Sequence, residues 1–296
     1  MKHKYGFVAI LLLAVAFLGF CFTGIYVNSQ EKEEDGFLVV TSFYPMYIAA
    51  ENIVGESENV TLKNLSEPQT GCMHDYQLTP EDMKLLSGAD VFIINGGGIE
   101  TFLAKVAQAY PDLLIVDASE GVDLEEDNSH VWMSIPAHMQ QVQNIARAVC
   151  DLDGENREYY EARKEEYLSE LSKLKEQQEE IRREIQGEKI ISFHEAYDYV
   201  ARDFGLTVAL TLDLDEERQV SAGEVADVLA AVADEGISVI FAEELYGREM
   251  AQTVQKEADV TVCYLDTLVR GEYEPDSYIK NMKENIRLIR EAYGVE

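Results

Sequence analysis

The stretch that decides the fold is residues 157–186, REYYEARKEEYLSELSKLKEQQEEIRREIQ. It contains no Gly or Pro, and its apolar side chains recur at spacings of 7, 4, 3, 7 and 4 residues. These spacings place one apolar stripe on a continuous helix of about 30 residues, about 45 Å long. The stripe consists of Tyr160, Tyr167, Leu171, Leu174, Ile181 and Ile185. A stripe this narrow suits either a coiled-coil partner or a helix laid across two domains, and Gly187 is placed to end it.

The segment before this helix alternates short β-rich runs with amphipathic segments. Strands are expected at 37–43, 60–65, 90–96 and 113–118, and helices at 45–55, 80–88, 99–110 and 136–150. Thr79 and Pro80 are a good N-cap and first helical residue for the second of these helices. The alternation predicts a parallel sheet with crossover helices.

The segment after the long helix repeats the same pattern. Strands are expected at 189–194, 207–212, 237–243 and 259–265, and the last helix at 275–293. Ser221 and Glu224 form a capping box for a helix over 221–236. We therefore predict an α/β protein of two lobes, each with a central, mainly parallel sheet flanked by helices, joined by one long rigid linker helix. The predicted boundaries are 37–152 for the N-terminal lobe, 153–187 for the linker helix and 188–296 for the C-terminal lobe.

The N-terminus predicts export. A short basic region, MKHKY, precedes an apolar run over 7–27 that has no charge, about the length needed to span a bilayer. We assign 1–29 to a signal or membrane anchor and 30–36 to a tether. The LGFC run at 18–21 resembles a bacterial lipobox that would lipidate Cys21, but Phe20 stands where a small residue is expected, so a retained helix is the alternative. Either anchor leaves the body of the chain outside the membrane.

Charge and cysteine content narrow the class of protein. The chain has 56 Asp+Glu against 24 Lys+Arg, a net charge of -32, which argues against nucleic-acid binding. An acidic surface enriches cations, although it also serves solubility. The cysteines beyond Cys21 have no CxxC spacing and imply no disulfide framework; Cys72, two residues before His74, is a candidate ligand or a small buried residue. Nothing in the sequence demands more than a monomer.

Three histidines share one kind of location. His74, His130 and His194 each lie in a loop or at a strand end beside an expected helix, where open α/β sheets gather ligand sites. The positive end of a helix favours a neutral imidazole, which is the form that binds metal. His138 lies within an expected helix and is interpreted as a core residue. The spacings of 56 and 64 residues match no local metal motif, so spacing alone leaves the metal hypothesis open.

Six ordered blocks resemble one family. They are HDYQLTPEDM (74–83), NGGGIETFL (95–103), HVWMSIPAHM (130–139), SFHEAYDYVARDFGL (192–206), IFAEELY (240–246) and YLDTL (264–268). Together they resemble the zinc- and manganese-uptake group of ABC-transporter solute-binding proteins, the cluster A-I or cluster 9 group. The likeness runs in order from about residue 37 to the C-terminus. The family's Asp-Pro after the Trp, and the long His-rich loop of some zinc members, are absent here.

The resemblance implies a metal site. Its ligands would be His74, His130, His194 and Asp266, and three imidazoles with one carboxylate suit tetrahedral Zn²⁺. Manganese-binding members often have Glu where this chain has His194, which favours zinc and leaves Mn²⁺ or Fe²⁺ as the alternatives. Glu243 and Glu195 are candidates to accept imidazole N–H groups, or to supply a ligand if Asp266 does not.

The resemblance also implies a role. We expect an extracytoplasmic, membrane-tethered component of an ABC importer that captures Zn²⁺ between its lobes and delivers it to a permease powered by an ATPase. The long helix should limit hinge closure. The rival is a three-His zinc hydrolase or lyase with Glu195 as base, but Asp266 would close the open position that such a site needs. An adhesin role could coexist with transport.

Overall fold

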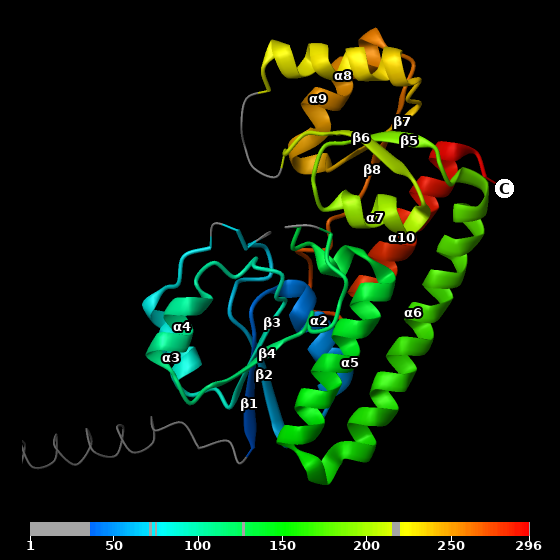
Figure 1. Ribbon diagram of the computed structural model, residues 1–296. Helices are drawn as coiled ribbons and strands as arrows, with labels where there is room; N and C mark the ends of the chain where they lie inside the picture. The colour runs from blue at the N-terminus through cyan, green and yellow to red at the C-terminus, as the bar shows by residue number, and fades with distance from the viewer. Residues whose placement is uncertain (1–35, 71–72, 75, 126–127, 215–219, 296) are drawn as a thin grey trace, which may run out of the picture.

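The computed structural model describes residues 36–70, 73–74, 76–125, 128–214 and 220–295. It shows two α/β lobes beside one long helix (Figure 1). The predicted anchor over 1–29, the tether residues 30–35 and Cys72 lie outside the described residues. In the part of the chain that is described, no helix has the length and apolar character to cross a membrane.

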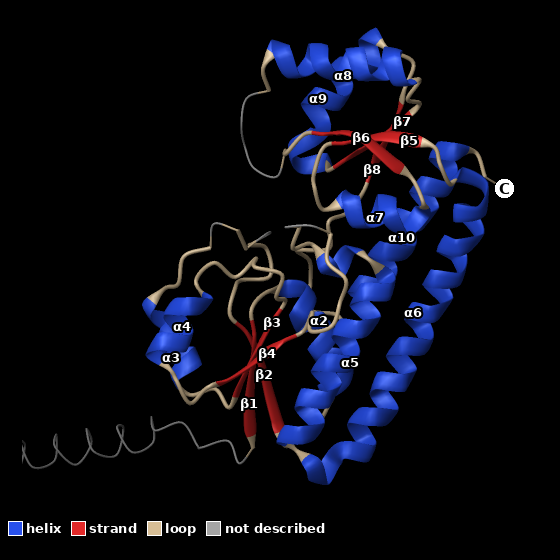
Figure 2. Cartoon of the chain, in the orientation of Figure 1, coloured by secondary structure: helices blue, strands red, loops and turns tan. Residues whose placement is uncertain are grey.

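The N-terminal lobe is built on a parallel sheet with strand order β2-β1-β3-β4. Its strands are β1 (Phe37–Thr41), β2 (Val60–Asn64), β3 (Val91–Ile94) and β4 (Leu114–Asp117). Its helices are α2 (Tyr44–Val54), α3 (Pro80–Ser87), α4 (Leu103–Ala109) and α5 (Ile135–Leu152). Figure 2 shows α3 and α4 on one side of this sheet and α2 and α5 on the other, as crossover connections between parallel strands require.

The C-terminal lobe repeats this topology with strand order β6-β5-β7-β8, again parallel. Its strands are β5 (Lys189–Ser192), β6 (Thr207–Thr211), β7 (Val239–Ala242) and β8 (Thr261–Tyr264). Its helices are α7 (Tyr197–Phe204), α8 (Ala222–Glu235), α9 (Glu244–Glu257) and α10 (Ser277–Tyr293). The predicted capping box of α8 is present, since Ser221 Oγ accepts from the Glu224 N–H and the Ser221 N–H donates to Glu224.

The long helix is α6 (Arg157–Ile185), and every residue of its predicted apolar stripe is buried. It packs against α5, α2, α7 and α10, which belong to both lobes. The stripe therefore serves a helix that runs alongside two domains of its own chain. The predicted fold class, two α/β lobes joined by one long helix, is confirmed.

Two clusters of buried apolar residues hold the molecule together. The larger extends from the N-terminal lobe through α6 to α7, α10 and one face of the C-terminal sheet. The smaller fills the space between the other face of that sheet and helices α8 and α9. The strands β5, β7 and β8 are parallel and are followed by His194, Glu243 and Asp266, so the carboxyl edge of the sheet carries all three.

Candidate metal centre

His74 lies in the loop between β2 and α3, directly before a strongly capped helix. Thr79 Oγ1 accepts from the Asp82 N–H at 3.2 Å, and the Thr79 N–H donates to Asp82 Oδ2 at 2.7 Å, which completes a capping box around Pro80. Thr101 Oγ1 donates to the His74 carbonyl at 3.4 Å. The His74 side chain remains about one-third exposed, at 34%. The helix cap and this loop contact hold the backbone, and the imidazole stays partly exposed.

His130 follows the loop after β4 and precedes the short 3-10 helix Val131–Met133. Its side chain is fully buried. Burial, followed by the neighbouring imidazoles of His194 and His74, lowers the pKa of His130 well below its usual range. The ring is therefore neutral at physiological pH, the form that can bind a metal ion.

The glycine turn at 95–100 supports the His130 loop. The N–H groups of Asn95 and Gly96 donate to the Glu100 carboxylate at 2.7 and 3.2 Å, and burial raises the pKa of Glu100 to about 7. Asn95 Nδ2 then donates to the Ser129 carbonyl at 2.9 Å, one residue before His130. A Cβ on Gly96, at φ +83, would lie 1.9 Å from Asp117 Oδ1, so this position requires glycine. The Gly run is a tight turn that closes on a carboxylate.

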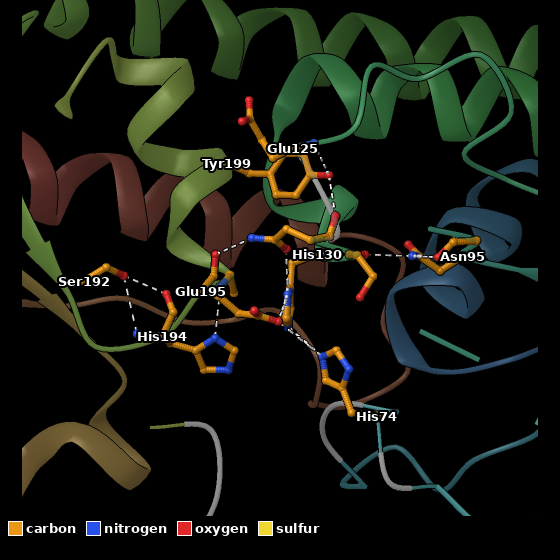
Figure 3. A network of polar contacts seen from close by, with 12 residues as sticks. His74, Asn95, Glu125, His130, Ser192, His194, Glu195 and Tyr199 are labelled. Atoms are coloured by element: carbon orange, nitrogen blue, oxygen red, sulfur yellow. Dashed lines mark hydrogen bonds and ion pairs between the residues drawn. The ribbon is translucent and has the colours of Figure 1, made fainter. Parts of the chain in front are cut away.

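His74, His130 and Glu195 converge on one point (Figure 3). In the described part of the chain, they form the group of His, Cys, Asp and Glu residues whose ligand atoms all lie within 4.8 Å of one another. The two imidazole Nε2 atoms are 3.5 Å apart, and Glu195 Oε1 is 3.7 Å from His74 Nε2 and 3.4 Å from His130 Nδ1. Two donors on one tetrahedral ion with 2.0–2.2 Å bonds are separated by about 3.4 Å, so the spacing of the two Nε2 atoms, and that of His74 Nε2 and Glu195 Oε1, suits a bound ion.

His194 lies beside the group without belonging to it. Its buried ring contacts that of His130, with the centroids 5.0 Å apart and the planes almost perpendicular. Its Nδ1 accepts from the Ala196 N–H at 3.0 Å, so the neutral ring carries its proton on Nε2. Before its Nε2 can present a lone pair to an ion, the ring must turn away from the Ala196 N–H and its proton must move to Nδ1.

Asp266 and Glu243 line an open cavity of about 1290 Å³ in the C-terminal lobe. Asp266 Oδ1 accepts from the Leu268 N–H at 2.7 Å, and Glu243 Oε1 is 3.7 Å from Arg270 Nη2. Neither belongs to the three-residue group described above. Of the residues that the sequence singled out, the structure thus brings together His74, His130 and Glu195, with His194 in contact.

Side chains from α7 tie the two lobes together around this group. Arg202 Nη1 donates to Glu125 Oε1 at 3.0 Å, and its Nη2 donates to Ser134 Oγ at 3.2 Å. From the N-terminal lobe, Trp132 Nε1 donates to the Thr267 carbonyl at 2.8 Å, next to Asp266. The ligand-bearing segments of both lobes are therefore hydrogen-bonded to each other. Sequence reasoning did not identify Arg202 or Thr267, because their partners are distant in the chain.

Comparison with known proteins gives a consistent picture. The model of the family described as ZnuA, Zinc-uptake complex component A periplasmic, matches residues 39–292. The chain is 27% identical over 321 residues to the High-affinity zinc uptake system protein ZnuA of Bacillus subtilis, covering all of both chains. It is also 27% identical over 271 residues to the Manganese-binding lipoprotein MntA of Halalkalibacterium halodurans, covering 88% of this chain and 89% of that protein.

Among solved structures, the chain is similar to the metal-dependent lipoprotein YcdH from Bacillus subtilis. The TM-score is 0.77 at 28% sequence identity, and the match covers 86% of this chain and 99% of the other. The family model and the structural match thus each cover most of the chain.

Proposed function

Because the chain belongs to the zinc-uptake complex component A family, the substrate-binding proteins of metal ABC importers, we propose that it captures one Zn²⁺ between its lobes and delivers it to a permease. Proteins of this family are not enzymes, so the hydrolase or lyase alternative is set aside. The relatives are named for zinc and for manganese, and the choice of zinc is part of the proposal.

The observation that carries the proposal is the convergence of His74, His130 and Glu195 from the two lobes within 4.8 Å. We propose these three as ligands, with His194 as the fourth after its ring rotates away from Ala196. Glu195 then replaces Asp266, the carboxylate that the family resemblance implies. Three imidazoles and one carboxylate give Zn²⁺ its preferred tetrahedral, nitrogen-rich site, whereas Mn²⁺ prefers more oxygen ligands.

The test measures metal content and affinity together on the full-length chain, purified in detergent. Elemental analysis should find one zinc per chain, and Mn²⁺ should fail to displace it in a competition titration. His130→Ala and Glu195→Gln should each weaken zinc binding at least tenfold, with Asp266→Asn as the matched carboxylate control. Tight binding of Mn²⁺ in preference to Zn²⁺ would overturn the metal assignment. A larger loss from Asp266→Asn than from Glu195→Gln would assign the carboxylate ligand to Asp266 instead of Glu195.

The proposal includes a location outside the cytoplasmic membrane, which the periplasmic family description and the lipoprotein names of relatives support. We assign the signal or membrane anchor to residues 1–29, either as a lipid on Cys21 or as a retained apolar helix. Mass spectrometry of the membrane-bound protein separates these two anchors. A mature chain that begins at a diacylated Cys21 identifies the lipid, and an intact Met1 identifies the helix. An adhesin role stays a prediction.

A further inference from the structure

Asn128 makes hydrogen bonds to both lobes at their junction. Its side-chain Oδ1 lies 3.0 Å from both the backbone N and the ring Nδ1 of His130. Its Nδ2 donates to the Glu195 carbonyl at 2.8 Å, and its own carbonyl accepts from the Tyr199 hydroxyl at 2.8 Å. Figure 3 labels His130, Glu195 and Tyr199, the residues that these hydrogen bonds join to Asn128. Asn128 is 9% exposed, so water competes little for these contacts.

The contact with His130 determines where the ring carries its proton. The amide orientation is fixed, because Nδ2 must donate to the Glu195 carbonyl and Oδ1 must accept from the His130 N–H. An amide oxygen only accepts, so the neutral His130 ring places its proton on Nδ1. Its Nε2, the atom 3.5 Å from His74 Nε2, then presents a lone pair to the position where the ligand atoms converge.

The contact with Glu195 joins this ring to the other lobe. Asn128 and His130 belong to the loop after β4, whereas Glu195 and Tyr199 belong to the turn after β5 and to α7. One buried amide therefore fixes the ring of one proposed ligand and the backbone of another. Tyr199 reinforces the junction, because its hydroxyl also accepts from the Glu125 N–H at 3.2 Å.

We propose that Asn128 is a positioning residue for metal binding: it holds His130 in the Nδ1–H tautomer and registers it against Glu195 across the two lobes. The expected effect on zinc affinity rests on the proposed function. The tautomer of His130 does not, because it is a property of the metal-free chain. Hydrogen-bond partners of this kind typically change metal affinity by 10- to 100-fold when removed.

Glu195 is the competing acceptor, since its Oε1 lies 3.4 Å from the same Nδ1. The amide oxygen is closer, at 3.0 Å, and it accepts from the His130 backbone as well. When the Glu195 carboxylate turns to an ion, Asn128 keeps the Nδ1 proton. The two acceptors can be separated by substitution, because Asn128→Asp retains the acceptor and loses the donor, whereas Asn128→Leu loses both.

The experiment is ¹⁵N NMR of the histidine rings in the full-length, metal-free protein in detergent at pH 7.5, with His130→Gln to assign the signal. Wild type and Asn128→Asp should show the Nδ1–H tautomer at His130, and Asn128→Leu should shift it toward Nε2–H. Glu195→Ala is the matched control and should leave the tautomer unchanged. Thermal midpoints of each variant verify that the fold is retained.

Zinc titrations of the same proteins complete the test. Asn128→Leu should weaken Zn²⁺ binding by about 10- to 100-fold, and Asn128→Asp by less, since it retains the tautomer.

A folded Asn128→Leu with an unchanged tautomer, or a tautomer lost in Glu195→Ala instead, would overturn the assignment. If the wild type shows the Nδ1–H tautomer but binds no zinc, the proposed function fails while the tautomer assignment stands. If Asn128→Leu loses the tautomer and keeps wild-type zinc affinity, the positioning role fails while the proposed function stands.

Discussion

The two lobes share one topology and differ in how their sheets are covered. The strand orders β2-β1-β3-β4 and β6-β5-β7-β8 are equivalent, and all strands within each sheet are parallel. Helix α5 buries a long face that includes Val142, Ile145 and Val149, whereas α8 buries only Val228. The N-terminal lobe, α6, α7 and α10 share one apolar cluster, and α8 and α9 cover a separate, smaller one.

The two clusters of buried apolar residues therefore do not follow the boundary between the lobes. Helix α7, which follows Glu195, packs into the cluster of the N-terminal lobe even though its strand belongs to the C-terminal sheet. The proposed metal ligands therefore lie on the elements that share the larger cluster, called here the cohesive part, and helices α8 and α9 lie outside it. Local stability should differ accordingly, because regions with less buried apolar surface open at lower free energy.

The largest expected effect comes from two adjacent residues of β5. Ile190 faces the larger cluster and Ile191 the smaller one, and both are fully buried. Truncation of each to Ala should lower the free energy of unfolding by about 2–5 kcal/mol. Ile190→Ala should lower the thermal midpoint of the whole chain, whereas Ile191→Ala should first raise hydrogen exchange in α8 and α9. Equal exchange patterns in the two variants would show that the clusters form one cooperative unit.

The next effect is a pH dependence within the larger cluster. His138 is fully buried between Gln141, Tyr167 and Tyr278, and burial lowers its pKa from 6.5 to about 4. Between those values the unfolded chain binds a proton that the folded chain does not, so stability is full above pH 6.5 and falls toward pH 4. The loss is about 3 kcal/mol.

Denaturant titrations of wild type and His138→Gln at pH 7 and pH 4.5 isolate this contribution. The comparison is needed because burial raises the pKa of Glu100 to about 7, which gives the opposite slope between pH 4.5 and 7. The glutamine variant should lose the part of the acid destabilisation that belongs to His138. An identical pH dependence in both proteins would contradict a buried neutral imidazole.

The fold was predictable because its signals are local. The stripe of α6 is a regular spacing within one helix, and the β-rich runs, the N-cap at Thr79 and the capping box at Ser221 each occupy a few consecutive residues; each appears where the sequence places it. Helices α7 and α9 were not predicted as separate helices. Neither has a side chain that caps its N-terminus, and neither has the proline that marks the first turn of α2, α3 and α5.

The candidate site was predictable only in part. His74 and His130 were singled out from their positions, and the structure places their Nε2 atoms 3.5 Å apart. Which of His194 and Glu195 faces them depends on the turn between β5 and α7, where the Ala196 N–H binds the His194 ring. That turn is set by packing of α7 against the other lobe, which no local pattern records. The partners of Asn128 are likewise set by tertiary structure.

A smaller effect is expected where α7 meets the N-terminal lobe. Arg202 donates to Glu125 and Ser134, and its guanidinium lies 4.8 Å from the centroid of the Tyr199 ring. Arg202→Gln should lower the free energy of unfolding by about 1–2 kcal/mol, because charge-assisted contacts between partly buried groups are lost. Arg147→Gln is the matched control, since its 4.0 Å pair with Glu120 is exposed and should contribute less than about 0.5 kcal/mol. Denaturant titration should show a clearly larger loss of unfolding free energy in Arg202→Gln than in Arg147→Gln. Similar losses would mean that these contacts do not join α7 to the cohesive part.

The smallest effect compares the two capping boxes, one in each lobe. Thr79→Ala and Ser221→Ala each remove a side chain that accepts from the N–H three residues later, and each should lower stability by about 1 kcal/mol. Their consequences for the proposed site should differ, because Thr79 fixes the end of the loop that carries His74, whereas α8 lies on the separate cluster. Thr79→Ala should weaken zinc binding severalfold, and Ser221→Ala should leave it unchanged while raising hydrogen exchange in the first turn of α8. Equal zinc affinities in the two variants would mean that the His74 loop keeps its shape without its cap, and a loss confined to Ser221→Ala would show that the α8–α9 layer is coupled to the site.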